Sequence, residues 1–177
     1  MYLYCKQRAF TLTELIVTIA VLAIIVMFAL PYYHKLKENQ EVTQVYSFLK
    51  QHIILAKNHA STSHNAVVMC SSEFLNRCEI NQWHKGILLF TDLNNNQSID
   101  NNEPIIASMK TDLRYGSLKL KNNSTTTNTI IFRGDTGLPR GAMGGFHYCS
   151  FNNSKNYKYF PVGQMANTQM KDTGVCP

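Results

Sequence analysis

The sequence predicts an α+β protein in which one long N-terminal helix is followed by a small antiparallel β-sheet. Two observations carry this prediction. The first third of the chain has helical patterning, with an uncharged apolar run from Leu15 to Leu30 and then an amphipathic stretch to about residue 60. The remainder contains short apolar runs separated by Asn, Gly and Pro, which is typical of hairpins. We therefore expect one apolar half of the helix and one half that packs on the sheet.

The composition suits one folded domain with an apolar appendage. The chain has 177 residues, of which 45% are hydrophobic and 16% are charged, so a disordered chain is not the expected state. The formal net charge of +6 is scattered, without a run of four basic residues. Such a mild excess of positive charge does not by itself identify a nucleic-acid or lipid partner.

Five cysteines divide into one before the apolar run, Cys5, and four after it. Four cysteines in an exported domain indicate two disulfides, for which three connectivities exist. We prefer the two local pairings, each of which would contribute about 2–4 kcal/mol. These pairings are Cys70 with Cys78 and Cys149 with Cys176. Neither a Cys-x-x-Cys pair nor the Cys/His spacing of a zinc site is present.

The N-terminal apolar segment allows three interpretations. From Phe10 to Leu30 it would extend about 31 Å as a helix, enough to cross a bilayer. A secretory signal peptide would end in a small-x-small site, but Met27 stands two residues before Ala29. A transmembrane anchor and a long buried helix are the other two interpretations. Glu14 distinguishes them, because an ionised side chain in lipid costs roughly 2–3 kcal/mol and usually has a partner.

The stretch Arg-Ala-Phe-Thr-Leu-Thr-Glu-Leu, residues 8–15, resembles the processing site of type IV prepilins. The resemblance implies that a prepilin peptidase cuts between Ala9 and Phe10 and methylates the new amino group of Phe10. Glu14 would pair with that amino group in a neighbouring subunit, because two buried charges are tolerable together and costly apart. Pro31 stands where pilins commonly carry a helix-disrupting proline, which permits a kink. The family usually has Gly where this chain has Ala9.

Beyond residue 31 the sequence predicts the rest of the helix, an exposed loop and seven strands. Apolar residues at steps of three or four predict that an amphipathic helix ends near the cluster Ser61-Thr62-Ser63. These residues are Val42, Val45, Leu49, Ile53 and Ala56. Asn122 to Asn128 reads as an exposed loop. The expected strands are 66–70, 86–91, 105–109, 117–120, 129–133, 146–150 and 157–162.

Residues 83–92 resemble the Trp-x-x-Gly strand and Asp-rich loop of GspH/FimT-type domains, and residues 67–70, 130–134 and 145–149 resemble other strands of that family. The resemblance implies a pilin-like lollipop fold with a leader at 1–9, a transmembrane and filament-core helix at 10–31, and a periplasmic domain at 32–177. It implies a minor pilin or pseudopilin that assembles into, and primes or caps, a type IV pilus. Its partners would be other pilins, the inner-membrane assembly machinery, prepilin peptidase and membrane lipid.

Three other functions remain open at this point. One is a DNA-binding minor pilin for natural transformation, and another is a type II secretion pseudopilin for protein export. The third is a membrane-tethered enzyme, which is disfavoured because no nucleophile, base and acid form a recognisable set. The expected location is the bacterial inner membrane, with a single pass and a periplasmic domain that becomes extracellular in the filament.

Six oxygen-bearing residues follow the spacing of a calcium-binding loop, at its positions 1, 3, 5, 7, 9 and 12. They are Asp92, Asn94, Asn96, Ser98, Asp100 and Glu103. Gln97 stands where the template has Gly, and the flanking segments are expected to be strands rather than helices. We therefore favour a polar hairpin loop with Asx turns and no cofactor, and keep calcium as the alternative.

Some members of this family bind DNA through a C-terminal Gly-Arg-x-Arg motif. The corresponding residues 163–166 read Gly-Gln-Met-Ala, so both arginines are missing. Other cations remain as candidates for phosphate contacts, with Tyr157 and Tyr159 available for stacking. These cations are Arg133, Arg140, Lys155, Lys158 and Lys171. We favour a solvated basic face over a DNA site.

Overall fold

The structure, a computed structural model, describes residues 10–122, 129–140 and 144–176. Ala9 of the predicted cleavage site and residues 123–128 of the expected polar loop lie outside the described residues. The chain divides into two compact units, with the boundary between Lys37 and Glu38. The helix α1 (Leu12–Ser63) contributes to both units.

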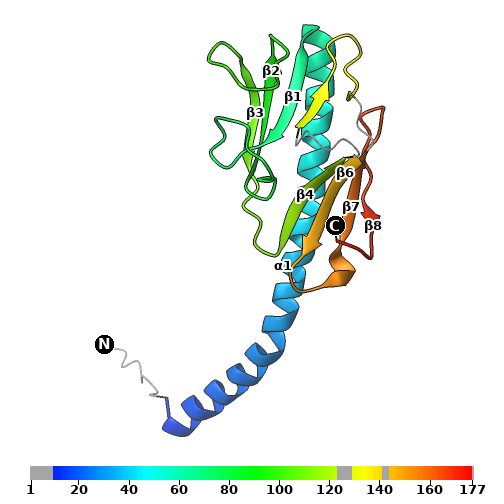
Figure 1. The fold of residues 1–177 in the computed structure, drawn as a ribbon. Coiled ribbons are helices and arrows are strands. Elements are labelled where there is room, and N and C mark those ends of the chain that lie inside the picture. The colour runs from blue at the N-terminus through cyan, green and yellow to red at the C-terminus, as the bar shows by residue number, and fades with distance from the viewer. Residues whose placement is uncertain (1–9, 123–128, 141–143, 177) are drawn as a thin grey trace, which may run out of the picture. The chain divides into compact units, whose positions relative to one another are not determined.

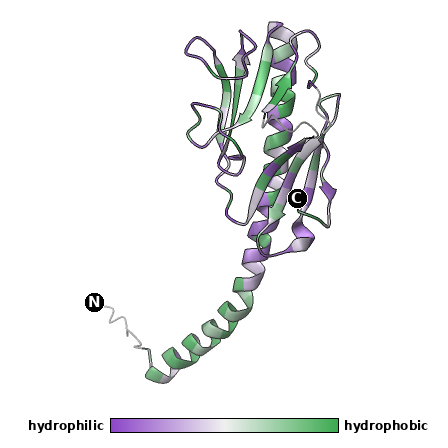
Figure 2. Cartoon of the chain, in the orientation of Figure 1, coloured by the Kyte–Doolittle hydropathy of each residue, from purple (hydrophilic) through white to green (hydrophobic). Residues whose placement is uncertain are grey.

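The part of α1 from Leu15 to Leu30 carries no charged side chain and is apolar on all sides. Thr11 is the N-cap residue of α1, because its Oγ1 accepts a hydrogen bond from the backbone N–H of Glu14 at 3.3 Å. Every large apolar side chain from Leu12 to Leu30 is at least half exposed, and Figure 2 shows this stretch as hydrophobic. By length and composition the helix can cross a membrane. It continues through Pro31.

The described residues of the second unit form eight strands in two antiparallel four-stranded sheets, whereas the sequence predicts one sheet (Figure 1). The first sheet has the order β3-β2-β1-β5 and the second has β4-β6-β7-β8. The strands of the first sheet are β1 (Ala66–Ser71), β2 (Gly86–Asp92), β3 (Ile105–Lys110) and β5 (Thr129–Phe132). Those of the second are β4 (Gly116–Asn122), β6 (Gly144–Ser150), β7 (Lys158–Val162) and β8 (Lys171–Asp172), and the short helix η1 (Ser154–Asn156) precedes β7.

One face of α1 joins both sheets into one core. All five residues of the predicted apolar stripe are buried, together with Ala60, and α1 ends at Ser63 as expected. They pack with inward-facing residues of both sheets, because alternate side chains of a strand share a face. Trp83, which is fully buried, meets the ring of Phe146 edge-on at 4.9 Å. The core residues of the sheets are Val67, Met69, Ile87, Leu89, Leu118, Ile130, Phe132, Phe146, Tyr148, Phe160 and Val162.

The opposite face of the first sheet carries a smaller apolar cluster. Val68, Cys70, Leu88 and Phe90 are buried there, and loop residues pack over them. Cys70 is bonded to Cys78 with a Cα–Cα distance of 5.6 Å, and the second disulfide joins Cys149 and Cys176 at 5.8 Å. These are the two local pairings that the sequence favours. Loops therefore cover this sheet on the side away from α1.

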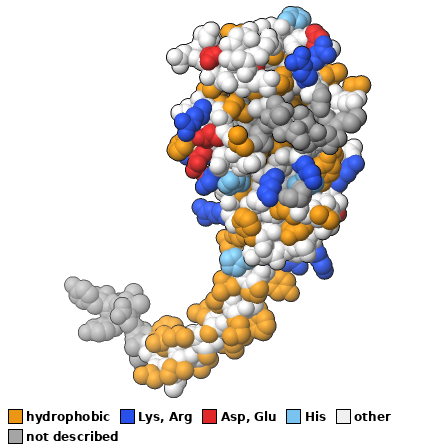
Figure 3. Space-filling model, viewed as in Figure 1, with side chains coloured by type: hydrophobic (Ala, Val, Ile, Leu, Met, Phe, Trp, Pro, Cys, Tyr) orange, Lys and Arg blue, Asp and Glu red, His pale blue; other side chains and the backbone are white. Residues whose placement is uncertain are grey.

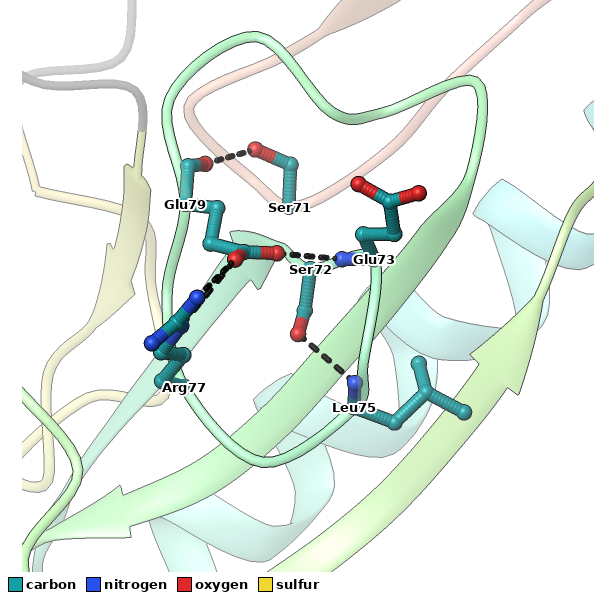
Figure 4. Close-up of polar contacts among 6 residues, drawn as sticks. All are labelled: Ser71, Ser72, Glu73, Leu75, Arg77 and Glu79. Atoms are coloured by element: carbon teal, nitrogen blue, oxygen red, sulfur yellow. Dashed lines mark hydrogen bonds and ion pairs between the residues drawn. The ribbon is translucent and has the colours of Figure 1, made fainter.

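The loop that follows β1 is closed by the polar contacts drawn in Figure 4 and also by the disulfide between Cys70 and Cys78. The Glu79 carboxylate accepts from the backbone N–H of Glu73 at 2.7 Å and from Arg77 Nε at 3.0 Å. These donors, the Glu73 N–H above all, hold the pKa of Glu79 below its ordinary value. This contribution to stability is present at neutral pH and is lost as the pH falls through that lowered pKa.

Two glutamates on α1 bind the second sheet through hydrogen bonds. Glu38 is buried, and its Oε1 accepts from Ser150 Oγ at 2.6 Å and Asn156 Nδ2 at 2.7 Å. Glu41 accepts from the backbone N–H of Arg114 at 2.7 Å and from Tyr148 Oη at 2.8 Å. Burial, followed by the charge and hydrogen bond of Glu41, raises the pKa of Tyr148, so its hydroxyl stays protonated and donates.

We expect Glu41→Ala to lower the free energy of unfolding by about 2 kcal/mol, because it leaves the buried Tyr148 hydroxyl and two backbone N–H groups without their acceptor. Urea unfolding of the full chain in a neutral detergent measures this loss. Gln40→Ala is the matched control, because Gln40 is the neighbouring residue of the same helix and is exposed. A loss below about 0.5 kcal/mol for Glu41→Ala, the range of ordinary surface changes, would contradict the prediction.

Candidate functional site

The first candidate site is the N-terminal end of α1. Phe10 is 76% exposed, and the apolar side chains that follow it are exposed around the whole helix. Glu14 lies at the head of this surface, one turn after Phe10. Among the residues that the structure describes, three ion pairs occur and none involves Glu14. The site therefore combines an unpaired carboxylate with a wide apolar surface.

Thr11 and Glu14 have the spacing of a helix-capping box, of which the structure shows the Thr11 half. The Glu14 N–H donates to Thr11 Oγ1, and Leu15 N donates to Thr11 O at 3.2 Å. Thr11 therefore caps the helix through the backbone N–H of residue 14, and the Glu14 carboxylate takes no part in these two contacts. That carboxylate is left available for a cation outside the described chain.

The predicted calcium loop is a hairpin loop between β2 and β3. Both oxygens of Asp92 accept backbone N–H groups, from Asn96 at 3.2 Å and Gln97 at 3.0 Å. Both oxygens of Glu103 do the same, from Leu93 at 2.8 Å and Asp100 at 3.1 Å. The carboxylates thus cap the loop's own backbone, as in Asx turns.

The other predicted metal ligands take part in the same network. Asp100 Oδ2 accepts from Asn94 Nδ2 at 2.7 Å and Asn96 Nδ2 at 2.9 Å, and Asn96 Oδ1 accepts from Ser98 N at 2.7 Å. Within residues 10–122, 129–140 and 144–176, no three His, Cys, Asp or Glu side chains are placed to hold a metal ion. In the structure these side chains bond to one another and to the loop's own backbone.

We expect the thermal midpoint of the protein to be the same in EGTA and in millimolar calcium, because the loop oxygens already have hydrogen-bond donors. Differential scanning calorimetry of the full chain measures this. A calcium-dependent rise in the midpoint that Asp92→Asn abolishes would contradict the prediction, since ligand binding to the native state stabilises it by mass action. Magnesium at the same concentration controls for ionic strength.

The predicted DNA-contacting cations divide between two places. Arg133 and Arg140 line a polar cavity of about 260 Å³ together with His64, Asp92 and Asp135. Arg133 is paired there with Asp135. The cavity therefore has mixed charge, and the two arginines lie apart from the three lysines in the fold.

The three predicted lysines lie on or beside the second sheet. Lys155 belongs to η1, and Lys171 lies on β8. Lys158 on β7 is paired with Asp172, so its charge is already matched. The residues aligned with the missing Gly-Arg-x-Arg motif form a turn, in which Ala166 N donates to Gly163 O at 2.9 Å.

Two functional features were missed at the sequence level. The first is the pair of hydrogen-bonding glutamates, Glu38 and Glu41. In the sequence both look like ordinary exposed residues of an amphipathic helix, because their partners Ser150 and Tyr148 lie far away along the chain. The cations Lys119 and Lys121 alternate with Leu118 and Leu120 along β4. That alternation is a signal for an exposed basic face, which the sequence reasoning did not use.

Comparisons with known proteins agree with these observations. The family model described as "Type II transport protein GspH" matches residues 49–160, and "Prokaryotic N-terminal methylation motif" matches residues 4–30. No curated protein sequence matches the chain. Two crystal forms of the type IV minor pilin FimU of Pseudomonas aeruginosa (strain PAO1) have a similar fold, with TM-scores of 0.60 and 0.51 at 15% sequence identity.

The matches cover most of both molecules. The alignments include 80% and 76% of this chain and 99% of each FimU chain. At this identity the likeness to FimU concerns the fold, one long helix packed on antiparallel sheets. The GspH model, by contrast, matches more than half of the residues in sequence. Together with the methylation motif, this match shows that the chain belongs to the GspH/FimT family of type IV pilin-like proteins.

Proposed function

We propose that this protein is a minor pilin that is held in the bacterial inner membrane before it assembles into a type IV pilus, which it primes or caps. One observation carries the proposal: a helix whose apolar side chains are exposed on all sides begins at an unpaired carboxylate. Membership of the GspH/FimT family of pilin-like proteins supports a structural role in a filament. The more specific role at the filament start or tip rests on the resemblance to minor pilins.

The exposed apolar surface explains why such a subunit would need a membrane and then a filament. Burying a large aliphatic side chain is worth about 1.5–3 kcal/mol. Lipid supplies that environment before assembly, and the helices of neighbouring subunits supply it afterwards. Moving the helix from lipid into the filament core therefore changes its free energy little. Specific contacts must then decide the register between neighbouring subunits.

The Glu14 carboxylate would provide such a contact. Cleavage before Phe10 would create a charged amino group at the end of each helix. A neighbouring subunit one step along the filament could present that group to Glu14. The attraction between the two charges is strong in a low-dielectric core, where either charge alone is costly.

Intact-mass analysis of the membrane-extracted protein tests the processing step. The expected mass corresponds to loss of residues 1–9, one added methyl group and two disulfides. An Ala9→Gly variant should be processed at least as fast, and Ala9→Leu should retain the leader because a large residue replaces the small one at the cut. Retention of the first nine residues by the native protein would contradict the proposal.

A type II secretion pseudopilin is the second candidate, favoured by the description of the matching family model. The two roles share the same processing and the same anchor. A clean deletion separates them, since a pilus role predicts loss of sheared surface filaments with normal export. A secretion role predicts retention of exported proteins in the periplasm with normal surface filaments.

A further inference from the structure

The apolar run of α1 ends in a short segment of different composition, residues 32–37, which we call the collar. It reads Tyr-Tyr-His-Lys-Leu-Lys, follows Pro31 directly and lies within the first unit. Its side chains are exposed except that of Lys37, which is half-buried. Figure 3 shows hydrophobic side chains along the N-terminal part of α1. Two tyrosines and two lysines therefore lie just past this apolar surface, on the same continuous helix.

The two tyrosines have the position of an interfacial aromatic pair. Tyr32 is 76% exposed and Tyr33 is 52% exposed, so neither ring belongs to a protein core. Tyrosine combines an apolar ring with a polar hydroxyl and is enriched where hydrocarbon meets water. Consecutive residues of a helix point about 100° apart, so the pair presents its rings on two sides of α1. A boundary between lipid and water accounts for two such exposed rings at this place.

The collar carries positive charge that no carboxylate of the described chain matches. None of the three ion pairs among the described residues involves Lys35 or Lys37. Lys37 Nζ lies 5.6 Å from the centroid of the Tyr33 ring, a contact that holds the ammonium group beside the ring and keeps its charge. The next acidic residues along the helix, Glu38 and Glu41, accept hydrogen bonds from β6 of the second sheet. The two lysines are therefore suited to an external anion.

The distance from the collar to Glu14 matches the thickness of a bilayer. The helix continues through Pro31, and residues 14–32 extend about 27 Å along it. The hydrocarbon core of a bilayer is about 30 Å thick. With the collar at one interface, the Glu14 carboxylate reaches the headgroups of the opposite leaflet. Its charge then stays hydrated, which avoids the cost of an ionised group in hydrocarbon.

We propose that the collar binds the headgroups of anionic phospholipids and thereby fixes the depth of α1 in the bilayer. Its lysines contact the headgroups, because an anionic membrane surface attracts cations that lie beside a membrane helix. Its tyrosine rings lie at the boundary of the hydrocarbon. Collar binding rests on the proposed anchoring in the inner membrane, where the collar faces the periplasmic leaflet. It adds a lipid preference to that anchoring, and it keeps Glu14 outside the hydrocarbon while the subunit is in the membrane.

Fluorescence quenching by brominated lipids tests the lipid preference on the membrane-extracted protein in vesicles. Phe28→Trp supplies a reporter one turn before the collar, because Phe28 is 66% exposed within the apolar run, whereas the native Trp83 is fully buried. The vesicles contain phosphatidylcholine and phosphatidylglycerol, and either lipid carries the bromine at the same mole fraction. We expect phosphatidylglycerol to be enriched about fivefold beside the reporter. Lys35→Gln combined with Lys37→Gln should abolish this enrichment.

A matched double variant, Lys50→Gln with Lys110→Gln, removes the same charge outside the collar and should keep the enrichment, because both side chains are exposed elsewhere in the chain. A second reporter, Leu15→Trp, tests the depth of the helix next to Glu14. Lipids brominated near the headgroup should quench it more than lipids brominated near the chain end, because residue 15 lies close to the opposite interface.

Three results would overturn the proposal. The two lipids could quench the Phe28→Trp reporter equally, which would leave the membrane anchor intact and remove only the collar. Both double variants could lower the enrichment alike, which would indicate a general effect of net charge. The Leu15→Trp reporter could be quenched mainly from the bilayer centre, which would place Glu14 in the hydrocarbon. Absence of quenching by either lipid would contradict the membrane anchor itself, so failure of the anchor and failure of the collar give different results.

Discussion

Glu14→Gln should be processed normally and yet be almost absent from surface filaments. The substitution keeps the size of the side chain and the Thr11 cap, because the cap uses the backbone N–H of residue 14. It removes the charge that would neutralise the amino group of a neighbouring Phe10. Breaking a buried ion pair by removing one partner costs about 3–5 kcal/mol, which corresponds to at least a hundredfold loss of incorporation.

The measurement is the ratio of sheared to membrane-bound protein in a strain that lacks the native gene. Intact mass of the membrane form shows whether the leader has been removed. Thr18→Val is the matched control, because Thr18 lies one turn further along the same exposed surface and its hydroxyl donates to Leu15 O within the helix. We expect that variant to assemble normally. Normal incorporation of Glu14→Gln would remove the ion pair from the mechanism.

Trp83→Ala should lower the free energy of unfolding by about 3–5 kcal/mol. Trp83 is fully buried between α1 and the sheets, and its ring meets Phe146 edge-on. Its removal leaves a cavity that the rigid sheets cannot fill. Domains are stable by only about 5–15 kcal/mol, so this loss is a large share of the total free energy of unfolding. The thermal midpoint should fall by roughly 10 °C.

Chemical unfolding of the full chain in neutral detergent, followed by circular dichroism, measures this loss. Trp83 Nε1 has no hydrogen-bond partner within the described part of the chain, so Trp83→Phe gives up packing volume but no hydrogen bond, and its loss should be smaller. Ile80→Ala is the control, because Ile80 is 74% exposed. An effect of Trp83→Ala as small as that of Ile80→Ala would show that the core rearranges around the gap.

Local patterns were sufficient to predict most of the elements. The spacing from Val42 to Ala56 predicted the buried stripe of α1, and the structure buries every one of those residues. Each of the seven expected strands forms with ends displaced by no more than two residues. The two-residue β8 was missed, since so short a strand has no periodicity and exists only through its pairing with β7.

The sequence by itself determined the apolar N-terminal helix, the acidic residue at its head, the amphipathic continuation and the antiparallel class. These follow from the spacing of apolar residues, and such spacing is a local property. Only the tertiary structure decided that the strands form two sheets, and that Glu41 meets Tyr148 across 107 residues of chain. It also decided that Lys119, His147, Tyr159 and Lys171 share one face. Strand order and register depend on pairing between segments that are far apart in the chain. The sequence of one short strand says little about which other strand it will pair with.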